Sequence, residues 1–118
     1  MINNTRKTIF CDIDGTIFKH HETLNLMIKK ATILPGVIEK FLEWRKKDYY
    51  IVLTTARPEG CRSATEKQLY NFGIFFDQLI MGLPTGSRII INDKKNDGTI
   101  TCESVCLKRN SGLKGLKI

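Results

Sequence analysis

The stretch that decides the fold is Ile9-Phe10-Cys11-Asp12-Ile13-Asp14-Gly15-Thr16. Its apolar beginning predicts a strand over Lys7–Cys11, and its end carries two carboxylates two positions apart, followed by a glycine. Past the strand the chain can curl, so that Asp12 and Asp14 face one site. One carboxylate can then bind a metal and attack while the other moves a proton, and Gly15 permits a tight turn and close approach of a phosphate. Taken alone, the motif also fits a simple strand-ending turn, where Asp and Gly are common.

Strand-like and helix-like stretches alternate along the rest of the chain. Helices are predicted to open after Leu34-Pro35-Gly36 and over Cys61–Phe72. Strands are predicted over Tyr49–Leu53, within Phe76–Met81, over Arg88–Ile91 and, more weakly, within Thr101–Leu107. The stretch Thr16–Thr32 fits either a hairpin or a short helix. This alternation predicts an α/β fold with a doubly wound parallel sheet, in a single domain over residues 1–118.

Polar residues follow three of the predicted strands. They are Asp12 with Asp14, Thr54 with Thr55, and Asn92 with Asp93. The carboxyl ends of parallel strands meet at one edge of the sheet, and ligands bind outside that edge. We therefore expect these side chains to converge on one site.

The charge balance indicates an anionic partner. Lys and Arg number 19 against 12 Asp and Glu, a net charge of +7, and such a surface attracts anions. The positive residues are spread along the chain without a block of five like charges. We read the excess as favouring a phosphorylated substrate, with a dedicated nucleic-acid surface as the less favoured interpretation.

Composition also argues against several classes. No apolar run approaches the ~20 residues that span a bilayer, and the polar start lacks the apolar segment of a signal peptide, so a cytoplasmic location is expected. None of the four cysteines forms a C-x-x-C pair, and His20 and His21 are far from them in sequence. Reduced thiols, rather than a zinc site, are predicted.

Three motifs in this order resemble those of the haloacid-dehalogenase-like (HAD) phosphatase superfamily. The first is Ile9–Thr16, the second is Ile51–Pro58, and the fourth is Ile89–Asp93 with Asp97 following. The resemblance covers about residues 7 to 107 and implies a core domain without a cap, because neither gap between motifs has room for one. It is nearest to small capless phosphatases of bacterial or phage surface-sugar pathways. Capless relatives either act on large substrates or use neighbouring subunits as lids, and the second case implies a homo-oligomer.

The resemblance also implies a role for each residue. Asp12 would be the nucleophile, forming an aspartyl-phosphate, and Asp14 would protonate the leaving oxygen and later activate water. Thr55, chosen over Thr54 because the working hydroxyl precedes the small residue Ala56, would bind the phosphoryl group together with Ala56. Mg²⁺ would be held by Asp12, the main-chain carbonyl of Asp14, and Asp93. A set of oxygen ligands suits this hard cation.

The third motif departs from the family's pattern. Gly82-Leu83-Pro84 has leucine where relatives carry a lysine. Arg88 is the first replacement candidate for phosphate binding, and Lys67 and Lys94 are the others. Arg57 either reaches a substrate anion or is a surface arginine. His20 and His21 either touch substrate from a flap or are exposed loop residues.

Three functions follow from these observations. The leading one is a Mg²⁺-dependent phosphomonoester hydrolase acting on a phosphorylated small molecule, a sugar phosphate. A nucleotide or polynucleotide-end phosphatase is the alternative that the net charge supports. A non-catalytic phosphate- or Mg²⁺-binding module is the alternative that the missing lysine supports, although pure binding would not require the second acid, Asp14.

Overall fold

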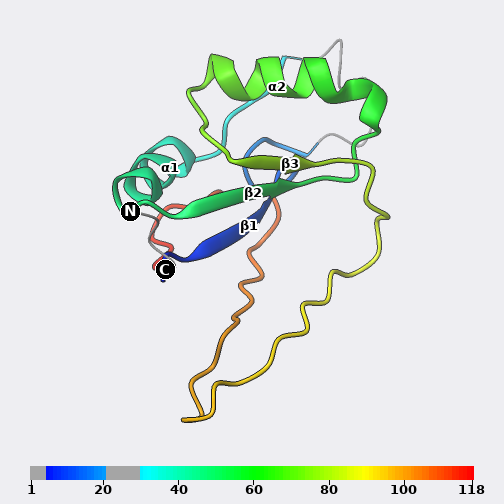
Figure 1. Ribbon diagram of the computed structural model, residues 1–118. Coiled ribbons are helices and arrows are strands. Elements are labelled where there is room, and N and C mark those ends of the chain that lie inside the picture. Colours follow the sequence, from blue (N-terminus) through cyan, green and yellow to red (C-terminus); the bar gives the residue numbers. More distant parts are fainter. Residues whose placement is uncertain (1–4, 21–29) are drawn as a thin grey trace.

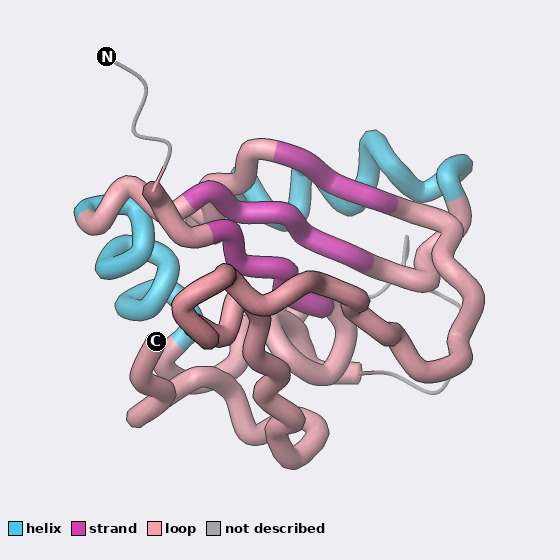
Figure 2. The backbone as a smooth tube through the Cα atoms, turned by 60° about the horizontal axis from the view of Figure 1, so that its bottom comes forward, coloured by secondary structure: helices cyan, strands magenta, loops and turns pink. Residues whose placement is uncertain are grey.

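The computed structural model describes residues 5–20 and 30–118, which form a parallel sheet with two helices (Figure 1). The strands are β1 (Thr8–Asp12), β2 (Tyr50–Thr54) and β3 (Gln78–Ile80). The helices are α1 (Val37–Lys46) and α2 (Arg62–Asn71), and a 3-10 turn, η1 (Glu59–Cys61), precedes α2. The strands lie side by side in the order β1-β2-β3, all parallel (Figure 2). These elements confirm the predicted α/β class and five of the predicted segments.

The sheet owes its stability to the apolar runs that predicted it. The central strand β2 buries Ile51, Val52 and Leu53 almost completely, because it has a neighbour on each side. Pairing in register places Asp12 beside Thr54 at the carboxyl ends of β1 and β2. The strands therefore deliver a carboxylate and a hydroxyl to the same edge.

Both helices pack against one face of the sheet. The strand residues of that face share a hydrophobic core with Trp44 of α1 and Leu69 of α2. On the other face, Phe10 is 57% exposed. Two right-handed crossovers in the same direction, from β1 to β2 and on to β3, put both helices on the same side. The described elements thus make a small α/β sheet compatible with a Rossmann-like core, but not the second helical layer of a doubly wound sheet.

The predictions of strands over Arg88–Ile91 and within Thr101–Leu107 are wrong. Residues 83–108 instead form a long extension, here called the arm, which projects away from the sheet (Figure 1). Ile89 and Ile91 are 82% and 90% exposed. A short apolar run has the composition of a strand but does not itself specify a partner. Within the described residues β1 pairs only with β2, so its other edge carries no strand.

Short-range hydrogen bonds fold the tip of the arm. The Gly98 N–H donates to the Lys95 carbonyl at 2.8 Å, and the Thr101 hydroxyl donates to the main-chain carbonyl of Asp93. Beyond the arm, the chain returns to the start of α1, where the Leu113 N–H donates to the Pro35 carbonyl at 2.8 Å. All four cysteines are free. No helix in the described part of the chain is long and apolar enough to cross a membrane.

Candidate active site

A tight loop after β1 presents both carboxylates. The Ile13 carbonyl accepts from the backbone N–H groups of Ile17 and Phe18, at 2.8 and 3.1 Å. The Gly15 N–H donates to the Phe18 carbonyl at 2.7 Å, and Gly15 has a φ of 92°, which a residue with a Cβ rarely adopts. The chain therefore curls immediately after the strand, and Asp12 and Asp14 are both half-buried at the carboxyl edge.

Asp12 lies next to a cation. An Arg88 guanidinium nitrogen is 3.7 Å from its carboxylate, and the Thr16 hydroxyl donates to the other carboxylate oxygen at 3.4 Å. Burial raises the pKa of Asp12 above its ordinary value, Arg88 opposes that increase, and the nearby charge of Asp14 adds to it. A half-buried carboxylate facing an arginine is suited to meeting an anionic group.

Asp14 is held by Arg57. Two guanidinium nitrogens of Arg57 donate to the two Asp14 carboxylate oxygens, each at 2.8 Å. The same guanidinium donates to the Thr65 hydroxyl at 3.0 Å and to Gln68 at 2.7 Å, both in α2. Arg57 is only 5% exposed, so the interpretation as a surface arginine is wrong. It is a buried anchor that fixes the second acid of the motif.

The end of β2 places its two threonines differently. Thr54 is half-buried and in register with Asp12. Thr55 is 1% exposed, and its hydroxyl accepts the backbone N–H of Arg57 at 3.0 Å. Ala56 is exposed next to it. Of the two threonines, Thr54 is therefore the one whose register places it beside Asp12.

Arg88 reaches Asp12 because the predicted strand is absent. The chain leaves β3 at the carboxyl edge of the sheet, so the loop that follows can bring Arg88 to that edge. A parallel strand that began at Arg88 and delivered Asp93 to the carboxyl edge would start about 16 Å back along the sheet. That distance exceeds the reach of an arginine side chain, so the Arg88–Asp12 ion pair and Asp93 beside Asp12 are alternative arrangements. Lys67 and Lys94 are both exposed.

The predicted metal ligands are not assembled. The described residues contain no group of three His, Cys, Asp or Glu side chains placed to hold a metal ion. Asp12 and the main chain of Asp14 lie at the carboxyl edge, whereas Asp93 belongs to the arm. The cation beside Asp12 is Arg88. In this arrangement the residues do not fit Mg²⁺, because the third oxygen ligand is missing and an arginine faces the first.

The C-terminal segment contributes to the site, which the sequence did not reveal. The Asn110 N–H donates to the Gly15 carbonyl at 2.8 Å, and the Asn110 side chain accepts the backbone N–H of His20 at 2.7 Å. The pairing spans about ninety residues and has no local pattern that could have predicted it. His21 lies outside the described residues.

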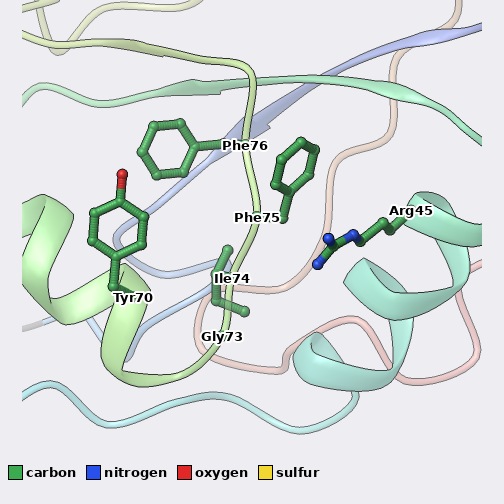
Figure 3. Close-up of a pocket in the computed structure, with 6 residues that line it drawn as sticks. All are labelled: Arg45, Tyr70, Gly73, Ile74, Phe75 and Phe76. Atoms are coloured by element: carbon green, nitrogen blue, oxygen red, sulfur yellow. The ribbon is translucent and has the colours of Figure 1, made fainter.

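A separate cavity of about 290 Å³ lies between α1 and the segment before β3 (Figure 3). The Arg45 guanidinium lies 5.1 Å from the centre of the Phe75 ring, and Tyr70 stacks on Phe76. These residues precede β3, so the cavity is at the amino end of the sheet. It takes no part in the site around Asp12.

Comparison with known proteins supports the fold. No family model matches the chain, and no curated protein matches its sequence. Several solved structures are similar to it, and three of them follow. One is D,D-heptose 1.7-bisphosphate phosphatase from B. bronchiseptica, complexed with magnesium and phosphate, with a TM-score of 0.52 and 20% identity over 64% of this chain and 49% of that one.

The second is the Pnkp1/Rnl/Hen1 complex, with a TM-score of 0.58 and 20% identity over 82% of this chain and 33% of that one. The third is a protein from Vibrio cholerae, with a TM-score of 0.52 and 18% identity over 81% of this chain and 79% of that one. The chain thus spans about half of the first structure and a third of the second. At the level of the fold, these likenesses confirm the resemblance to HAD-type phosphatases.

Proposed function

We propose that this protein is a phosphomonoester hydrolase in which Asp12 attacks the phosphoryl group. The observation that carries the proposal is the pairing of each motif carboxylate with its own arginine at the carboxyl edge: Asp12 with Arg88 and Asp14 with Arg57. Two carboxylates two residues apart, one next to a half-exposed cation, suit a nucleophile and a proton carrier. A fold shared with a phosphatase supports this interpretation.

In the proposed reaction an Asp12 carboxylate oxygen bonds to phosphorus and the ester oxygen leaves. Arg88, 3.7 Å from Asp12, would stabilise the charge on the phosphoryl oxygens. The hydroxyl of Thr54 or Thr55 and the backbone N–H of Ala56 would donate hydrogen bonds to the same oxygens. Asp14 would give a proton to the leaving oxygen and later take one from the water that hydrolyses the aspartyl-phosphate. Arg57 donates to both Asp14 oxygens and so fixes the position of this carboxylate.

We also propose a requirement for Mg²⁺. When bound, such a cation neutralises the repulsion between a carboxylate and a phosphate. Asp12, the Asp14 carbonyl and Asp93 are the proposed ligands. Asp93 reaches them only if the arm folds back along the free edge of β1 as a further strand. In that arrangement Mg²⁺ would take over from Arg88 the neutralisation of charge beside Asp12, and Asp12 and Asp14 would keep the roles given above. The magnesium in the heptose-bisphosphate phosphatase structure supports this part of the proposal.

The proposed substrate is a sugar phosphate, taken up by a single capless domain over residues 1–118 that forms a homo-oligomer in the cytoplasm. The similarity to a heptose-bisphosphate phosphatase supports a sugar phosphate as the substrate. A polynucleotide-end phosphatase is the second candidate, favoured by the net charge of +7 and by the Pnkp1 complex among the neighbours. The third candidate is a non-catalytic module that binds phosphate, and the metal-ligand set left unassembled among the described residues favours it over a metal-dependent enzyme.

A phosphate-release screen tests these candidates. Purified protein is assayed with sugar phosphates, nucleotides and 3′- or 5′-phosphorylated DNA ends, each with Mg²⁺ and with a chelator. The proposal expects release from at least one substrate class, lost on chelation. Release that survives chelation would remove the metal from the proposal. If no substrate releases phosphate, the non-catalytic binding module becomes the favoured function.

A further inference from the structure

Arg109 lies directly over the loop that carries the two acids. A Cβ placed on Gly15 would be 3.2 Å from Cγ of Arg109 and 3.7 Å from Cβ of His20. The aliphatic part of Arg109 therefore covers Gly15, which is buried, while the residue as a whole remains exposed. Its position, some 95 residues from the loop in sequence, comes from the fold.

Hydrogen bonds fix this placement. Asn110 binds the Gly15 carbonyl through its backbone and His20 through its side chain. Asn110 has a φ of 64°, which is uncommon outside glycine. The Ser111 backbone N–H and hydroxyl both donate to the Lys108 carbonyl, at 3.2 and 2.6 Å, and close the turn. The stem of Arg109 is thus held against the Gly15 loop by a built turn.

The guanidinium of Arg109 forms no ion pair within the described part of the chain. Arg57 and Arg88 are each paired with a motif carboxylate, whereas no ion pair joins Arg109 to a described carboxylate. A cation at the rim of a phosphate site attracts a second anionic group of the substrate. An arginine recognises phosphate with particular strength, through charge-assisted hydrogen bonds.

We infer that Arg109 binds a second phosphate of the substrate, one that is not transferred. This inference rests on the proposed function and narrows its substrate class to molecules with at least two phosphates. The second phosphate comes either from a small bisphosphate or from the backbone of a nucleic-acid strand.

Steady-state kinetics of Arg109→Ala test the inference with matched pairs of substrates. One pair is fructose 6-phosphate and fructose 1,6-bisphosphate; the other is thymidine 3′-monophosphate and a 3′-phosphorylated oligothymidylate. For a two-phosphate substrate we expect KM to rise about tenfold and kcat to stay unchanged, because the variant loses one charged hydrogen bond to the substrate. KM for the one-phosphate partner should not change. The pair that shows the effect identifies the source of the second phosphate.

Two further variants separate recognition from structure. Arg109→Lys keeps the charge and should recover part of the affinity. Lys114→Ala removes an equal charge beside Gly36, at the start of α1, and should leave both substrates unaffected. An equal rise in KM for one- and two-phosphate substrates would mean that Arg109 only supports the loop. No change in either would also overturn the inference.

A binding measurement keeps the inference separate from the proposed function. Calorimetric titration with methylenediphosphonate and with inorganic phosphate needs no turnover. Arg109→Ala should weaken binding of the diphosphonate about tenfold and leave phosphate binding unchanged. If the wild-type protein releases no phosphate from any substrate, the proposed function fails while this comparison still decides the role of Arg109. Equal affinities of the two proteins for the diphosphonate would overturn it.

Discussion

Arg57 donates hydrogen bonds to the Asp14 carboxylate, to Thr65 and to Gln68 from a buried guanidinium. Arg57 lies within the second motif, but the sequence could not predict its partner, because Asp14 is 43 positions away. The same limit applied to Arg109 over Gly15. Asp12 and Asp14 were predictable because a strand, two acids and a glycine follow one another in a local pattern. Contacts between distant segments require the fold.

Replacing Arg57 should cost more stability than replacing any surface arginine. Arg57→Met leaves the Asp14 carboxylate without its partner, and truncating one member of a buried pair costs about 3–5 kcal/mol. Because Asp14 is partly exposed, we expect the lower end of that range in urea unfolding. The control is Lys47→Met, whose ion pair with Glu43 is exposed and should cost at most about 1 kcal/mol. Equal losses of stability in the two variants would contradict the role of Arg57 as a buried anchor.

Cys11 should resist alkylation until the protein unfolds. Burial raises the pKa of its thiol to about 12, and the neighbouring charge of Asp12 acts in the same direction. Alkylation requires the thiolate, which at pH 8 is nearly absent at Cys11 in the folded protein. The exposed Cys106 is the internal control. Mass spectrometry after iodoacetamide treatment should find Cys106 modified first and Cys11 only in urea; early modification of Cys11 would contradict the burial of β1.

At the scale of elements, the sequence predicted those helices and strands whose own residues form a recognisable pattern. β1, β2 and β3 follow from apolar runs, and α1 and α2 follow from helical spacing after a turn that contains a glycine. The Arg88–Ile91 run carries an equally good strand signal, but a strand also needs a free edge in the right place and a chain path that reaches it. The loop after β3 instead brings Arg88 to the carboxyl edge, beside Asp12.

The depth to which an apolar run is buried determines how much stability is lost when one of its side chains is truncated. Leu53→Ala opens a cavity in the centre of the sheet and should lower the free energy of unfolding by about 2–5 kcal/mol. Ile91→Ala removes a side chain that is already 90% exposed and should change it by no more than about 0.5 kcal/mol. Both are measured by urea unfolding in metal-free buffer. A large loss for Ile91→Ala would show that the arm packs against the sheet even without metal.

At the scale of the whole molecule, Arg88 and Asp93 are alternative neighbours of Asp12. The proposed Mg²⁺ site therefore requires the arm to move. Hydrogen exchange of residues 88–92 should be fast without metal and slower with Mg²⁺, because a strand added to β1 protects its amides. Asp93→Ala should abolish this protection and sharply raise the Mg²⁺ concentration needed for activity. Glu103→Ala, an exposed acid on the arm, is the control. Unchanged exchange with Mg²⁺ would remove Asp93 from the ligand set.

The central claim is that Asp12 is the nucleophile, and phosphate release by Asp12→Asn tests it most directly. An amide cannot form the acyl-phosphate, so release from the best substrate should fall by about 10⁴-fold or more, as when other enzymes lose their nucleophile. Asp48→Asn, in the exposed turn after α1, should leave the rate unchanged. A circular dichroism spectrum like that of the wild type would show that Asp12→Asn is folded. Near-wild-type release by folded Asp12→Asn would contradict the account.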